Sequence, residues 1–175
     1  MTSRICRTAA ALALLGGLAG GCATPSGGTS MDPQAELDAR PRSAEMVSRY
    51  EQMQQRIRGR LDAELGPFSW QVRSEGDRAG CGGEFANSAG MVVYLPRWGF
   101  DGGISDADWP RAKQIVGEIT AEHGFTTPTL QIDRPGAHET SAADEALGAQ
   151  YNFATQANTS IAVTTGCHLD DSRDG

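Results

Sequence analysis

The sequence lacks the short motifs that indicate the commonest kinds of enzyme chemistry. It has no Gly-x-Ser-x-Gly elbow, no HExxH pair, no P-loop and no Gly-x-Gly-x-x-Gly at the start of a helix. The run Gly80-Cys81-Gly82-Gly83 resembles a phosphate cradle only superficially, because it lies inside a predicted loop and not between a strand and a helix. We therefore predict no catalytic residue and no cofactor.

Metal-ligand patterns are also scarce, since the chain has three histidines. His138 and Glu139, with Asp133 and Asp144 near them in sequence, are residue types that bind metal ions. They fall in or beside residues 134–146, which we expect to be a solvated excursion loop because the segment is polar and has no apolar periodicity. No metal site is expected there.

The remaining candidate ligands are assigned structural positions. His123 is predicted in the last turn of a helix, where the helix dipole favours a cation, and His168 at an exposed strand end. Asp170, Ser172 and Asp174 match the first half of a calcium loop, but the chain stops before the position of the bidentate glutamate. Calcium binding is therefore not predicted.

Positive charge is in short supply. The formal net charge is −7, and removal of Arg4 and Arg7 with a leader peptide leaves 13 basic and 22 acidic residues. Nucleic acid would be repelled by this balance, and so would anionic lipid headgroups. Nucleic acid is therefore excluded as a partner, and contact with a membrane would have to depend on attached acyl chains.

The first residues have the organisation of an export signal. Arg4 and Arg7 precede an apolar run over residues 9–18, which is too short to span a bilayer. Leu18-Ala19-Gly20-Gly21-Cys22 resembles a lipobox, although the leucine stands one residue further from the cysteine than usual. We predict a signal peptide over residues 1–21 and lipidation of Cys22, and the alternative is ordinary secretion.

The rest of the chain is divided by composition. Residues 22–43 are rich in Gly, Ser, Thr and Pro, which is typical of a flexible tether between the lipid and a folded domain. We expect one domain over residues 44–169, since about 125 residues support a single core. The acidic residues 170–175 are predicted to be a disordered tail.

Two cysteines remain for the domain once Cys6 has left with the signal peptide and Cys22 carries lipid. Cys81 and Cys167 would normally pair in an oxidising compartment outside the cytoplasm. The alternative is a metal pair, but only His168, next to Cys167, is near either cysteine. We therefore expect a disulfide.

Periodicity predicts an α+β domain with the element order α-β-β-α-β-β-β. Apolar residues recur every three or four positions in a first helix that opens near Ser43 and ends at Gly66-Pro67, and again over about 105–124. Alternation predicts strands over 68–74, 91–98, 129–133 and 149–154, and a last strand over 161–165. Short connections favour a two-layer sandwich, a mostly antiparallel sheet with both helices on one face.

One segment is a candidate for binding. Residues 98–103 are predicted to form a glycine-rich loop that carries Trp98 and Phe100. An exposed aromatic flanked by glycines is a common means of stacking a sugar or gripping a partner. The alternative is that both rings fold back onto the core beneath the second helix.

Several stretches of the domain share an order and spacing with a known family: Tyr50-Glu51, Arg56-Ile57, Pro67, Trp70, Cys81, Ile104-Ser105, Asp108-Trp109, Ala112, Ile115-Val116, Gly124, Thr126-Thr127, the aromatic hairpin and Thr165-Gly166-Cys167. Together they resemble the LppA-like lipoproteins of actinobacterial envelopes. A lipobox cysteine followed by two domain cysteines fits that family. The resemblance implies a lipid-anchored envelope protein with Cys81 paired to Cys167, and it implies no activity and no catalytic residue.

These observations favour a non-enzymatic lipoprotein, held to the cell membrane through lipid on Cys22, with its domain on the extracytoplasmic side. The domain would bind an envelope protein or a small ligand. One alternative is a periplasmic carrier of a lipid or other apolar molecule, which predicts an enlarged apolar cavity. Another is a small cell-wall hydrolase, which predicts a cleft with a strongly perturbed carboxylate or histidine.

Overall fold

The computed structural model describes residues 32–170, and Cys22, the leader and residues 171–175 lie outside them. Within the described part, no helix is long and apolar enough to cross a membrane. The elements in chain order are α1 (Pro33–Ala39), α2 (Ser43–Leu65), β1 (Gln71–Ser74), β2 (Asp77–Gly80), η1 (Gly83–Phe85), β3 (Gly90–Tyr94), β4 (Arg97–Asp101), α3 (Trp109–Ala121), β5 (Thr127–Arg134), β6 (Ala137–Asp144), β7 (Ala149–Thr155), β8 (Asn158–Thr164) and β9 (His168–Leu169).

The strands form one antiparallel sheet. Its main path runs β1-β4-β8-β7-β6-β5, and β3 pairs with β2, β8 and β9. β3 and β4 act as one strand interrupted at Pro96, since both pair with β8 and the amide of Leu95 donates to Val163 O at 3.0 Å between them. Proline has no N–H to give to the ladder, which explains the interruption.

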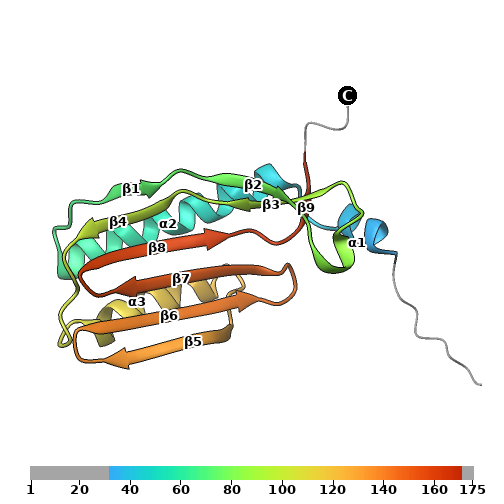
Figure 1. Cartoon of the computed structure of the whole chain (residues 1–175). Coiled ribbons are helices and arrows are strands. Elements are labelled where there is room, and N and C mark those ends of the chain that lie inside the picture. Colours follow the sequence, from blue (N-terminus) through green and yellow to red (C-terminus); the bar gives the residue numbers. More distant parts are fainter. Residues whose placement is uncertain (1–31, 171–175) are drawn as a thin grey trace, which may run out of the picture. The chain divides into compact units, whose positions relative to one another are not determined.

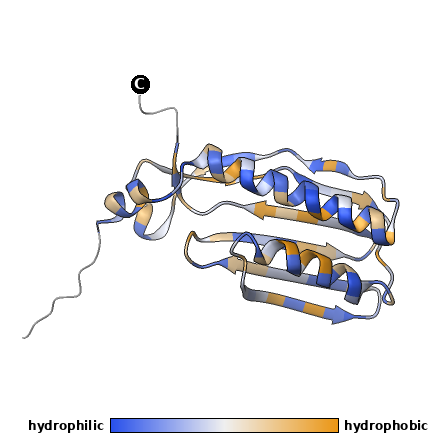
Figure 2. Ribbon diagram, turned by 180° about the vertical axis from the view of Figure 1, so that it is seen from behind, coloured by the Kyte–Doolittle hydropathy of each residue, from blue (hydrophilic) through white to orange (hydrophobic). Residues whose placement is uncertain are grey.

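Helices α2 and α3 cover one face of this sheet (Figures 1 and 2). The core lies between the two layers. The predicted apolar stripe of α2 runs from Met46 to Leu65, and its residues are buried apart from the half-buried Val47 and Leu65. Phe100, Phe153 and Ile161 meet that stripe from the strands. The predicted two-layer α+β sandwich with both helices on one face is confirmed.

The prediction of a loop over residues 134–146 is wrong. These residues include β6, which lies between β5 and β7 and has five of its eight residues buried. The sequence of β6 shows no apolar alternation because the side chains that face the helices include His138, Thr140 and Asp144. The second half of the sheet therefore has four strands, β5 to β8, and not three.

Two further segments expected to lack regular structure also contain it. The loop predicted between the first two strands holds β2 and the short helix η1. Residues 32–43, expected to be tether, form α1, where the Asp32 side chain accepts from the amide of Gln34 at 3.1 Å and caps the helix. Leu37 of α1 is 1% exposed. Ordered structure therefore begins well before Ser43.

Leu37 belongs to a second, smaller core at one end of the sheet. It packs with Cys81, Phe85, Cys167 and Leu169, and Cys81 and Cys167 form a disulfide with their Cα atoms 5.7 Å apart. Arg40, which follows α1, donates to the carbonyl oxygens of Leu147 and Cys167, each at 3.2 Å. The helix is thus fixed to the sheet by apolar burial and by hydrogen bonds.

Candidate functional site

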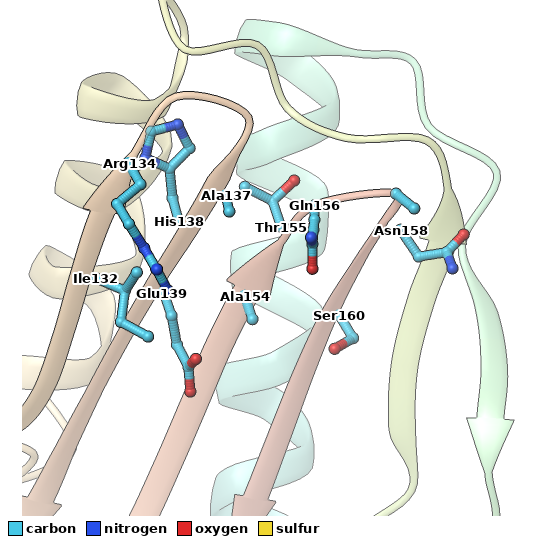
Figure 3. A pocket seen from close by; sticks show the side chains of 11 residues that line it. Ile132, Arg134, Ala137, His138, Glu139, Ala154, Thr155, Gln156, Asn158 and Ser160 are labelled. Carbon is cyan, nitrogen blue, oxygen red and sulfur yellow. The ribbon is translucent and has the colours of Figure 1, made fainter.

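The face of the sheet away from the helices carries a polar hollow. Alternation places Tyr151, Phe153 and Thr155 of β7 in the core, so Asn152 and Ala154 face the opposite side. The hollow has a volume of about 420 Å³, within the range of small-ligand sites. It lies over β5 to β8 near the β5–β6 and β7–β8 turns (Figure 3).

Strand register explains why the sheet is hollow at this place. Ile132, Glu139, Ala154 and Ser160 are successive cross-strand partners in β5, β6, β7 and β8. In the neighbouring row Arg134 pairs with Ala137, and Gln156 follows at the end of β7. Short side chains therefore form the floor, while Arg134, Glu139 and Gln156 rise around it, as Figure 3 shows.

The polar groups of the hollow differ in how they are held. The Asn152 amide donates to Glu139 Oε1 and also to Ser141 Oγ, the latter at 2.9 Å. Among residues 32–170, by contrast, nothing forms a hydrogen bond or ion pair with the Arg134 side chain. The Asn158 amide points away from the other side chains in Figure 3, and with its amide correctly oriented it donates to Asp101 Oδ1 at 3.2 Å.

His138 lies at the edge of the hollow, between two carboxylates. Its Nδ1 is 2.7 Å from Asp133 Oδ1, and its Nε2 is 2.8 Å from Asp106 Oδ1. A carboxylate only accepts hydrogen bonds, so both ring nitrogens donate and the ring is an imidazolium. Burial lowers the pKa of His138, but the hydrogen bonds and charges of Asp106 and Asp133 outweigh it, and the pKa is raised above 6.5.

This histidine holds three segments together. Asp106 precedes α3, and its Oδ1 also accepts from the amide of Gly136 in the β5–β6 turn at 2.8 Å. That amide and His138 lower the pKa of Asp106, so its carboxylate stays charged. The His138 ring stacks on Trp109 of α3, with centroids 5.0 Å apart, and Trp109 stacks in turn on Phe153. The hollow therefore rests on a rigid polar and aromatic support.

The residues singled out from the sequence do not meet at this site. Residues 97–101 form β4, so the predicted loop with Trp98 and Phe100 is wrong. Phe100 is 3% exposed and stacks on Phe68 in the core, and Arg58 lies over the ring of the half-buried Trp98 at 3.7 Å. Of the two alternatives, the rings fold back onto the helix-covered side of the sheet, but Trp98 lies against α2 and not beneath the second predicted helix. Neither is available as an exposed aromatic platform.

The other predicted groups are also placed by the structure. Cys81 and Cys167 lie at the far end of the sheet from the hollow, as a disulfide and not a metal pair. His168 is 0% exposed, contrary to the prediction of a surface position, and its Nδ1 donates to Pro41 O at 2.8 Å. Within residues 32–170, no group of three or more His, Cys, Asp or Glu side chains is arranged so that it could hold a metal ion.

Sequence reasoning missed the hollow because it missed β6. The dipeptide Pro135-Gly136 was a usable signal, since Pro-Gly marks a tight turn and Gly136 has a φ of 72° there. A hairpin centred on this turn places Arg134 beside Ala137 and Glu139 beside Ile132. The contribution of Asp106, which comes from the segment before α3, has no comparable local signal.

Comparisons with known proteins agree with this fold. The LppA family model, described as a lipoprotein confined to pathogenic Mycobacterium, matches residues 22–171. The crystal structure of LppA from Mycobacterium tuberculosis is similar with a TM-score of 0.60 and 13% identity, over 80% of this chain and 85% of that one. A DUF4853 family protein from Actinomyces odontolyticus gives a TM-score of 0.57 and 18% identity, over 77% and 73%. No curated protein matches the chain by sequence.

Proposed function

The chain belongs to the LppA lipoprotein family, and on that premise we propose that it is a non-enzymatic, lipid-anchored envelope protein that binds a small polar ligand on the uncovered face of its sheet. The observation that carries this proposal is the hollow of about 420 Å³ over β5 to β8. Its lining combines apolar and polar side chains that project from paired strands, which is how binding sites commonly fix a ligand's orientation.

The position of the hollow supports the same proposal. The described residues nearest in sequence to Cys22 are those of α1, and α1 lies at the opposite end of the sheet from the hollow (Figure 1). The family match begins at Cys22, the residue that we propose carries the lipid. If lipid on Cys22 anchors the domain, the hollow lies at the end of the sheet away from α1, the described element nearest to Cys22 in sequence.

A carrier of apolar molecules is a second candidate, and one observation favours it. A groove of about 430 Å³ between α3 and β5 is lined in part by Phe125, Pro128, Ala142 and Tyr151. An apolar dye bound there would be displaced by envelope lipid if the carrier function holds. A hydrolase finds less support at the polar hollow, where Glu139 is the one carboxylate among the lining residues.

The anchor is tested by replacing Cys22 with Ser in the full chain. Without the thiol no diacylglycerol can be attached, so the protein should move from the membrane fraction to the medium or periplasm. Cys6→Ser, in the leader, is the matched control and should leave the protein in the membrane fraction. A Cys22→Ser variant that stays membrane-bound would rule out lipid anchoring at this residue.

Ligand binding is tested on the released Cys22→Ser protein. Amide NMR spectra are recorded before and after addition of small molecules filtered from digested host envelope. We expect shifts at outer-face positions such as Glu139, Ala154 and Ser160, and none at buried α2 positions such as Met53. Spectra that do not change anywhere would contradict the proposed function.

A further inference from the structure

Two side chains of opposite charge border the hollow without neutralising each other. Arg134 and Glu139 lie on adjacent strands and project over the same part of the sheet (Figure 3). No ion pair joins them, although ten other ion pairs occur within residues 32–170. A guanidinium and a carboxylate therefore face the same cavity with their charges available.

Glu139 is held in position for a ligand. The Asn152 amide donates to one of its oxygens, Oε1, and is itself fixed by a second bond to Ser141 Oγ at 2.9 Å. The other carboxylate oxygen, Oε2, has no hydrogen-bond partner within residues 32–170. A carboxylate oriented through one oxygen by a neutral donor can accept from an ammonium group through the other oxygen.

Arg134 provides the complementary group. Its guanidinium has no hydrogen bond or ion pair with any of residues 32–170, whereas most other arginines of the domain are paired with carboxylates or carbonyl oxygens. A planar guanidinium fits a carboxylate through two parallel hydrogen bonds. An anion alone would be repelled by Glu139, and a cation alone would be repelled by Arg134.

We propose that the hollow binds a zwitterionic α-amino acid group, with its carboxylate on Arg134 and its ammonium on Glu139. This inference rests on the proposed function and names the ligand class for that same site. Ala137 and Ala154 leave room for the α-carbon and its substituent on the floor. Gln156 and Ser160, on the far side of the floor, supply an amide and a hydroxyl for the rest of the ligand.

Such a group has two sources, a free amino acid or the end of a branched peptide in which both α-groups remain free. Calorimetric titration of the released Cys22→Ser protein uses alanine for the first source and γ-glutamylalanine for the second. N-acetylalanine, which keeps only the carboxylate, and alaninamide, which keeps only the ammonium, are the single-charge analogues. Each analogue should bind roughly 10-fold more weakly or worse, because one charge-assisted pair is lost.

Variants identify the site. Arg134→Gln and Glu139→Gln should each weaken binding of whichever zwitterion binds the parent more tightly, by roughly 10-fold or more. Glu139→Gln retains an oxygen that can accept from the Asn152 amide. Arg97→Gln, which removes an exposed arginine of the same face outside the hollow, is the matched control and should bind as the parent does. Equal binding of the zwitterion and both analogues, or no loss in either variant, would overturn the inference.

Failure of this inference is distinguishable from failure of the proposed function. If neither zwitterion binds but digested envelope still shifts the amides of Glu139, Ala154 and Ser160, the site exists and its ligand is not a zwitterion. If neither zwitterions nor envelope molecules shift these amides, both the inference and the proposed function are wrong.

Discussion

The two ends of the sheet each bury a histidine, and one of these histidines is charged while the other is neutral. At the hollow, His138 lies between Asp106 and Asp133 and is charged. At the disulfide end, His168 is bonded to the carbonyl oxygen of Pro41, and its Nε2 has no partner within residues 32–170. Burial lowers the pKa of His168, although Pro41, Asp144 and Glu45 oppose that shift, so this ring is neutral. Two exposed carboxylates at one end, and burial at the other, make this difference.

The two ends also differ in what stabilises them. At one end α1 is held by Leu37, by Arg40 and by the disulfide, all of which restrict the chain before it continues towards Cys22. At the other end polar groups tie two turns together through Asp106. Beside them the Arg134 side chain forms no hydrogen bond or ion pair with any of residues 32–170. The comparison indicates one end of the sheet stapled by a disulfide and an apolar cluster, and another end where polar side chains border the hollow.

The largest expected effect comes from removing the disulfide. The double change Cys81→Ala and Cys167→Ala should lower the free energy of unfolding by about 4–5 kcal/mol, because the bond closes a long loop between residues 86 apart. Urea unfolding of the released Cys22→Ser protein, followed by tryptophan fluorescence, measures this loss. Amide exchange should rise first in α1 and β9, and equal increases in β5 and β6 would remove the distinction between the two ends.

His138→Gln should have a smaller effect that depends on pH. Near pH 6 the loss of two charge-assisted bonds should cost roughly 1–3 kcal/mol. A group with a raised folded pKa contributes stability that is fully present below its unfolded value of 6.5 and is lost as pH rises through the folded pKa. The free energies of unfolding of the parent and the variant, plotted against pH, should therefore converge as pH rises. Curves that stay parallel would show that His138 is not charged in the folded protein.

His168→Gln should have the smallest effect on stability, and the pH dependence of this effect should be opposite to that of His138→Gln. Because the folded pKa of His168 is lowered, its contribution is present above the unfolded value of 6.5 and is lost as pH falls through the folded pKa. Glutamine can still donate to Pro41 O but does not titrate, so the variant should lose less stability than the parent on acidification. A variant with the same acid sensitivity as the parent would contradict a neutral, buried His168.

Local sequence patterns were sufficient where the contrast between apolar and polar residues is strong. The stripe from Met46 to Leu65 predicted α2, and the alternation of Tyr151 and Phe153 predicted β7. β6 was missed because its buried residues are mostly small or polar and show no apolar period. Leu37 was missed because a single apolar residue in a polar segment carries no periodicity, although one buried leucine is enough to dock a short helix.

The sequence by itself determined the class of the fold, the face that the helices cover and the identity of the paired cysteines, because hydrophobic period and residue chemistry act locally. Only the tertiary structure decided where the candidate site lies. Arg134, Glu139 and Ser160 line one hollow through the register of four strands. His138 is held between Asp133, five residues away in the chain, and Asp106, 32 residues away. Such neighbours are set by strand pairing and packing, which no local pattern specifies.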